Sequence, residues 1–170
     1  NSVSFDPPLS TVKQEASRLK HVGGGYKVFF EVEGDPGAVM TLSRSTDSPL
    51  IGSFTYKRGE QHSVLAGFSL EPGALEKPVS EWQTVLEEFM PGVRLLSTFG
   101  HDWGDDALSN GSWCTYRPGC FGRVADELPR HEGHLYFASG DTTEGWRGFI
   151  EGAISSGSKA AVAVAHSLAS

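Results

Sequence analysis

The sequence has little cysteine, no long apolar run and no cluster of basic residues. Cys114 and Cys120 are its two cysteines, which suits a reducing compartment better than a disulfide framework. No stretch of eighteen apolar residues occurs, so we expect no membrane span and no membrane among the partners. The 14 basic residues are spread along the chain among 21 acidic ones, with Lys57 and Arg58 as the one adjacent pair, which argues against nucleic-acid binding.

The N-terminus also lacks a basic segment followed by an apolar one, so we expect no signal peptide and a cytoplasmic location. The chain starts at Asn1 instead of Met, which predicts a processed, trimmed or partial product.

Several motifs that would indicate common chemistries are missing. There is no GxGxxG, P-loop, nucleophile elbow or cysteine pair at zinc spacing. The glycines at 23–25 precede a strand-like segment, whereas a dinucleotide fingerprint follows a strand and opens a helix. The acidic cluster around His101 and Asp106 matches neither a zinc signature nor a calcium loop, so we expect a solvated turn and no metal site.

Hydrophobic periodicity predicts an α+β fold, a mostly antiparallel sheet with flanking helices. Helices are expected over residues 12–20, 80–90 and about 146–168. Strands are expected over residues 26–32, 39–43, 50–56, 63–68, 93–99 and 135–138. Residues 101–129 show little periodicity and read as a long loop, which in a compact domain is usually functional.

The segment from His134 to Ala153 combines a short apolar strand, a turn of small and hydroxyl residues, and a glycine-punctuated helix start. Free backbone N–H groups and the positive end of the helix dipole would create an anion-tolerant pocket there. An ordinary strand–turn–helix explains the pattern equally well.

Two further residues have alternative interpretations. Lys27 lies within an apolar strand, where it is either buried for a functional reason or exposed on a solvated face. The residue pattern favours the exposed alternative. Trp113 lies in an irregular loop dense in aromatic residues, and it would fill a core or face a ligand.

Five segments, taken in order, resemble motifs of the flavin-containing amine oxidase family, the monoamine oxidase-like flavoenzymes. Residues 3–9 resemble its I-x-F-x-P-P-L segment, and residues 23–28 its G-x-x-x-K-v strand. Residues 111–119 resemble the flavin-facing loop. Residues 136–142 and 148–154 resemble the terminal F-A-G-x-[ED]-x and G-[YF]-x-[ED]-G-A motifs.

The resemblance implies a role for each site residue. Lys27 would hold a water near flavin N5, and Trp113 and Phe149 would form two aromatic walls that favour a neutral amine. The implied cofactor-binding residues are Trp113, Gly140, Asp141, Thr142, Gly148, Phe149 and Ile150. Among these, Gly140 and Asp141 would follow the ribityl–phosphate part of FAD. Gly148 to Ile150 would bring a helix N-terminus to the pyrimidine edge of the flavin.

This sequence departs from the family pattern at several points, such as Asp141 and Ser139 in the terminal turn, and two departures bear on the cofactor and the partner. Some relatives attach flavin to a cysteine where this chain has Ser112, so we expect noncovalent FAD. The N-terminal Rossmann segment has no counterpart, so the partner would be the N-terminal remainder of the enzyme and the isolated chain would be inactive. Residues 1–104 would then complete a substrate-binding domain, and residues 105–170 a Rossmann-like FAD-binding domain.

The implied activity is oxidation of a small amine to an imine by hydride transfer to FAD, with reoxidation by oxygen to give hydrogen peroxide. One alternative is a flavin-dependent L-amino-acid oxidase, which needs a cation such as Arg117 or Arg147 for the substrate carboxylate. Another is a noncatalytic binding or structural module that lacks flavin.

Overall fold

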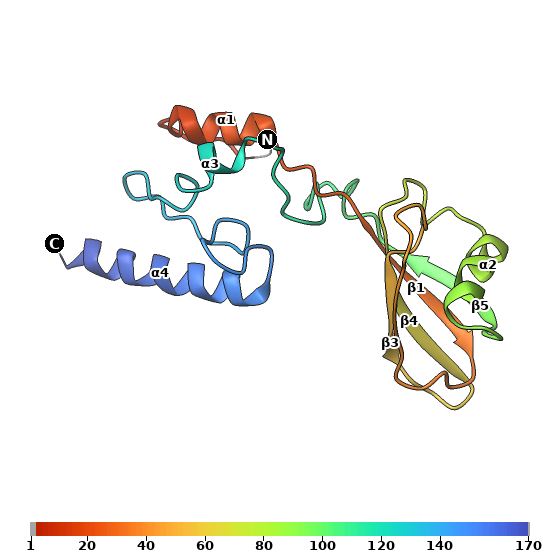
Figure 1. The fold of residues 1–170 in the computed structure, drawn as a ribbon. Coiled ribbons are helices and arrows are strands. Elements are labelled where there is room, and N and C mark those ends of the chain that lie inside the picture. The colour runs from red at the N-terminus through yellow and green to blue at the C-terminus, as the bar shows by residue number, and fades with distance from the viewer. Residues whose placement is uncertain (1–2, 170) are drawn as a thin grey trace. The chain divides into compact units, whose positions relative to one another are not determined.

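The computed structural model describes residues 3–169, and these form two compact units (Figure 1). One unit holds the described residues up to Gly23 together with those from Trp113 onward, and the other holds Gly24–Ser112. The expected division near residue 104 therefore differs from the spatial one. The N-terminal segment belongs to the same unit as the C-terminal one because the N-terminal helix contacts residues of the C-terminal segment.

The unit Gly24–Ser112 is built on an antiparallel sheet with the strand order β2-β3-β4-β1-β5. Its strands are β1 (Tyr26–Glu33), β2 (Met40–Leu42), β3 (Gly52–Lys57), β4 (His62–Ser69) and β5 (Leu95–Gly100). Helix α2 (Val79–Phe89) lies along one side of the sheet (Figure 1). The strands and the helix predicted for this region are confirmed, with ends that differ by a few residues.

The core of this unit lies between the sheet and α2. Alternate residues of β1, Val28, Phe30 and Val32, are fully buried there. Trp82 of α2 packs edge-to-face on Phe30, with ring centroids 5.1 Å apart. The indole Nε1 donates a hydrogen bond of 3.1 Å to the carbonyl of Ala74, so the buried polar atom is satisfied.

The other unit contains α1 (Thr11–Leu19), α3 (Phe121–Val124) and α4 (Ile150–Leu168). Buried Lys13 of α1 forms an ion pair of 3.3 Å with Glu132 and lies over the ring of Phe137. Glu132 also accepts the backbone N–H of Ser10 at 2.8 Å. The Ser10 side chain contributes most to lowering the pKa of the Glu132 carboxyl, and the Ser10 N–H and Lys13 lower it further. Contacts of α1 with the segment after α3 thus explain why the chain ends share a unit.

Two sequence predictions in this unit are wrong. Residues 135–138 do not form a strand, and the described residues there make only an isolated bridge between Glu132 and Leu135. A strand needs a neighbour for its N–H and C=O groups, and the described residues of this unit contain none. The last helix begins at Ile150 instead of about 146, because Trp146 and Gly148 have φ values of 51° and 78°, which no α-helix accommodates.

Within residues 3–169, no helix is long and apolar enough to cross a membrane. The same residues contain no group of three or more metal-ligating side chains. His101 instead pairs with Asp106 at 3.1 Å, and backbone N–H groups together with His101 lower the pKa of the Asp106 carboxyl.

Candidate functional site

A tight turn leads into α4 and carries most of the predicted site. The backbone N–H of Gly148 donates to the carbonyl of Gly140 at 2.9 Å, and that of Phe149 donates to Trp146 at 3.0 Å. Gly148 has a φ of 78°, a conformation that favours glycine. A Cβ added at Gly140 would lie 3.2 Å from the carbonyl oxygen of Phe149, which is closer than ordinary packing. Small residues at both positions therefore let the turn close on itself.

The N-terminus of α4 presents unpaired backbone donors beside exposed apolar side chains. Phe149 precedes the helix in an extended conformation and provides no side-chain cap. The N–H groups of Ile150, Glu151 and Gly152 find no acceptor among the described residues. Phe149 is 63% exposed and Ile150 82% exposed. This helix end can therefore accept negative charge and pack against a flat apolar group.

Asp141 connects the turn to the loop that carries Trp113. The carbonyl oxygen of Asp141 accepts a hydrogen bond of 3.3 Å from the Tyr116 hydroxyl, and the Cys114 thiol lies 3.8 Å from the same oxygen. Burial is the main cause that raises the pKa of both groups, so both stay protonated and can donate at neutral pH. The structure thus brings the loop of Trp113, which is itself 39% exposed, against the turn of Gly140 and Asp141.

Thr142 holds the turn from within. Its Oγ1 accepts the N–H of Ser139 at 3.2 Å and lies 3.5 Å from the Oγ of Ser156 on α4. The hydroxyl group is therefore engaged in positioning the turn on the helix.

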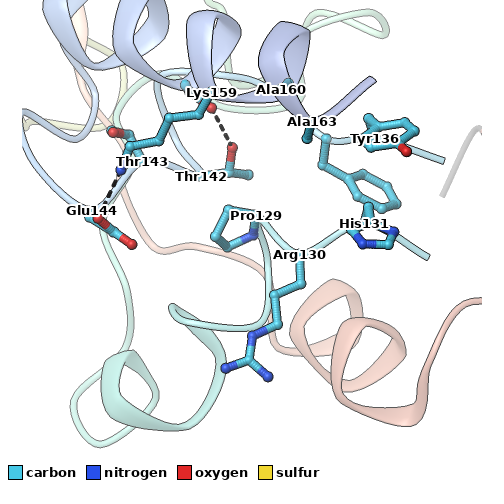
Figure 2. Close-up of a pocket in the computed structure, with 12 residues that line it drawn as sticks. Pro129, Arg130, His131, Tyr136, Thr142, Thr143, Glu144, Lys159, Ala160 and Ala163 are labelled. Carbon is cyan, nitrogen blue, oxygen red and sulfur yellow. Dashed lines mark hydrogen bonds and ion pairs between the residues drawn. The ribbon is translucent and has the colours of Figure 1, made fainter. Parts of the chain in front are cut away.

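A cavity of about 210 Å³ lies beside this turn, between α4 and the segment from Pro129 to Glu144 (Figure 2). Lys159 of α4 pairs with Glu144 across one side of it at 2.9 Å. Of the predicted site residues, Thr142 alone lines this cavity. The predicted aromatic walls therefore lie outside it.

Lys27 belongs to the other unit, where it lies on β1 and is exposed, as its strand pattern favours. Its Nζ is 5.6 Å from the centroid of the Phe68 ring, directly opposite on β4. The strand registers and ring contacts place six large apolar side chains on the same face, away from α2, with the small Ala66 between Phe54 and Phe29. We call this the aromatic sheet face: Met40, Phe54, Tyr56, Phe68, Phe29 and Phe99. Within its unit, Lys27 thus lies on an apolar surface.

Sequence reasoning missed the contacts of Tyr116 and Arg147. The Arg147 guanidinium packs on the rings of Tyr116 and Phe121, and its Nε donates to the carbonyl of Thr143 at 2.9 Å. Nothing in the local pattern signals these contacts, since the partners lie far apart in sequence. Arg117 donates to the carbonyl of Leu19 at 3.3 Å.

The family model described as flavin containing amine oxidoreductase matches residues 1–165. A pseudooxynicotine dehydrogenase from a Pseudomonas species is 40% identical over 98% of this chain and 34% of its own length. An (S)-6-hydroxynicotine oxidase from Paenarthrobacter nicotinovorans is 26% identical over 97% of this chain and 38% of its own. A solved putrescine oxidase triple mutant with redesigned cofactor binding shares the fold, with a TM-score of 0.78 at 17% identity, covering 96% of this chain and 40% of that one.

The chain therefore belongs to the flavin-containing amine oxidoreductase family. It spans little more than a third of the length of these curated relatives. The resemblance inferred from the five sequence segments is confirmed.

Proposed function

We propose that this chain is the C-terminal portion of an FAD-dependent enzyme that oxidises a small amine to an imine. The observation that carries the proposal is the turn before α4, where free N–H groups adjoin exposed Phe149 and the loop of Trp113. These residues fit the edge of a flat ring that gains negative charge on reduction. Bound FAD would accept a hydride from the amine α-carbon and pass the electrons to oxygen, giving hydrogen peroxide.

The residues of this chain would bind the cofactor, orient the amine substrate and exclude water from it. Trp113 and Phe149 would flank the amine, and their apolar rings would disfavour its charged form, which lowers the pKa of the bound amine. The N-terminus of α4 would stabilise negative charge at the cofactor. Lys27 would hold a water close to the reacting atoms. Gly140 and Asp141 would follow the ribityl–phosphate chain, and Ser112 leaves FAD noncovalent.

The two units suggest a division of work. We assign the sheet unit, Gly24–Ser112, to the substrate-binding domain, and the other unit to the FAD-binding domain. The aromatic sheet face supports an amine with an apolar or ring-containing body, because it shares its side of the sheet with Lys27. The names of the nicotine-related relatives make such amines the first substrates to test.

The amino-acid oxidase alternative is less well supported. Arg147 packs on two aromatic rings and donates to the carbonyl of Thr143, and Arg117 donates to the carbonyl of Leu19, so both candidate cations already contact other parts of this chain. The family match favours an enzyme over a module without flavin.

The test uses the whole protein that contains this chain. We expect a yellow preparation whose flavin absorbance bleaches when a nicotine-related amine is added without oxygen. Acid denaturation should release all of the flavin into the supernatant. The isolated chain should be colourless and inactive. Addition of the N-terminal remainder should restore both the yellow colour and the activity. A colourless whole protein, or flavin that no amine reduces, would contradict the proposal.

The electron acceptor needs a separate measurement, because one relative is named a dehydrogenase and the other an oxidase. Reduced enzyme should recover its colour in air and release one hydrogen peroxide per amine consumed. Recovery only with an artificial dye would exclude oxygen as the acceptor.

A further inference from the structure

Arg147 occupies the centre of a cluster that joins two separate segments of the chain. Its guanidinium carbon lies 5.3 Å from the centroid of the Tyr116 ring and 4.6 Å from that of Phe121. These two rings meet edge-to-face at 5.6 Å. A planar guanidinium can lie flat on an aromatic ring while it donates hydrogen bonds in its own plane, and a lysine ammonium has no such plane. We call these three residues, with Thr143, the Arg147 cluster.

The cluster is linked to the turn before α4 on both sides. Arg147 Nε donates to the carbonyl of Thr143, and the Tyr116 hydroxyl donates to the carbonyl of Asp141. One donor comes from the turn itself and the other comes from the loop that follows Trp113. The cluster therefore fixes the loop and the turn relative to each other.

The backbone next to Arg147 needs such support. Trp146 has a φ of 51°, a left-handed conformation that large side chains rarely adopt. The Trp146 side chain is 70% exposed, and its ring meets the Phe149 ring edge-on with centroids 6.0 Å apart. The Trp146 carbonyl accepts the Phe149 N–H that closes the turn. A strained residue persists where its surroundings determine its geometry, and Arg147 is the adjacent residue with the extensive contacts.

We infer that Arg147 is a positioning residue that sets the spacing between Trp113 and Phe149 and thereby the rate of amine oxidation. It acts through Tyr116 on the loop and through Thr143 on the turn, without touching the substrate. This inference rests on the proposed function, in which Trp113 and Phe149 flank the amine. A displacement of either wall by about 1 Å is enough to slow a well-oriented reaction about 100-fold.

The experiment compares Arg147→Met, Arg147→Lys and Tyr116→Phe in the whole flavoenzyme, with Arg123→Met as the control. Arg123 is an exposed arginine of the same unit that pairs with Glu15 of α1, and no hydrogen bond or ion pair among the described residues joins it to Arg147 or Tyr116. For each variant we would measure bound FAD per chain, the flavin circular dichroism spectrum and the limiting rate of flavin reduction at saturating amine. Only FAD-loaded molecules contribute to that rate, so a loss of stability alone leaves it unchanged.

We expect Arg147→Met and Arg147→Lys to lower the limiting rate about 10- to 100-fold and to change the flavin dichroism. Tyr116→Phe keeps the stacking ring but loses the hydrogen bond, so its effect should be smaller. Arg123→Met should match the wild type. Wild-type limiting rates in FAD-loaded Arg147→Lys would overturn the inference, and if Arg147→Met does not fold, the lysine and phenylalanine variants decide. A wild-type enzyme that binds no flavin would overturn the proposed function itself.

Discussion

Replacing Gly23 with alanine should displace Trp113, because position 23 has no room for a side chain. An added Cβ would lie 1.7 Å from the carbonyl oxygen of Trp113 and 2.6 Å from its carbonyl carbon. Both are backbone atoms, which cannot rotate aside as the end of a flexible side chain can. Restoring van der Waals contact requires a shift of about 1.5 Å between the two segments.

The neighbouring substitution Gly24→Ala is the matched control, since nothing lies within 4 Å of a Cβ at Gly24. Both substitutions reduce the entropy of the unfolded chain to a similar extent, so their difference isolates the crowding at Gly23. Crowding of a close-packed site typically costs about 1–3 kcal/mol. We therefore expect Gly23→Ala to lower the free energy of unfolding by about 1–3 kcal/mol relative to Gly24→Ala.

The assay measures urea unfolding and amine-driven flavin reduction in the whole flavoenzyme. If Trp113 is one of the aromatic walls, Gly23→Ala should also slow flavin reduction about 100-fold, because the wall moves by more than 1 Å. Gly24→Ala should reduce flavin at the wild-type rate. Equal stability and equal rates in the two alanine variants would refute the reasoning from this close approach.

Three other substitutions test separate parts of the molecule. Lys27→Met should slow flavin reduction or reoxidation at least about tenfold. The control Lys57→Met, at the exposed end of β3, should leave both rates unchanged. Equal rates for Lys27→Met and the wild type in stopped-flow traces would remove Lys27 from the mechanism. Contacts with α1 lower the pKa of Glu132, so their stabilisation is complete above the unfolded pKa of about 4.3 and is lost as the pH falls through the lower folded pKa. Glu132→Gln should reduce the acid-dependent drop in thermal stability, with the remainder coming from other carboxyls of lowered pKa such as Asp106, and an unchanged pH profile would contradict the assignment. Trp82→Phe leaves the Ala74 carbonyl without its buried donor and should cost about 1–3 kcal/mol in urea unfolding, a loss that a peripheral Trp82 would not show.

Sequence periodicity worked best for the sheet unit. Val28, Phe30 and Val32 alternate along β1, and α2 buries Trp82 and Leu86 on one face, so each element carries the signal of its own burial. The same reasoning failed for residues 135–138. Those residues have the composition of a strand, but a strand also requires a partner, which the described residues of that unit do not supply.

The start of α4 shows a second limit. The sequence predicts Gly145 and Gly148 as part of a helix start at about residue 146, and the positive φ of Trp146 cannot be read from its side chain, which favours ordinary helical or extended backbone. The next residue, Arg147, packs on aromatic rings that come from a loop far away in sequence, and we infer that these contacts support the conformation.

The sequence by itself determined the family, the order of most strands and helices, and the candidate residues Lys27, Trp113 and Phe149. It could do so because motifs and burial periodicity are properties of neighbouring residues. Only the tertiary structure decided that Gly23 touches the backbone of Trp113 and that Tyr116 reaches Asp141. Such contacts join distant segments, and they depend on how close-packed backbones approach each other, which no local pattern records.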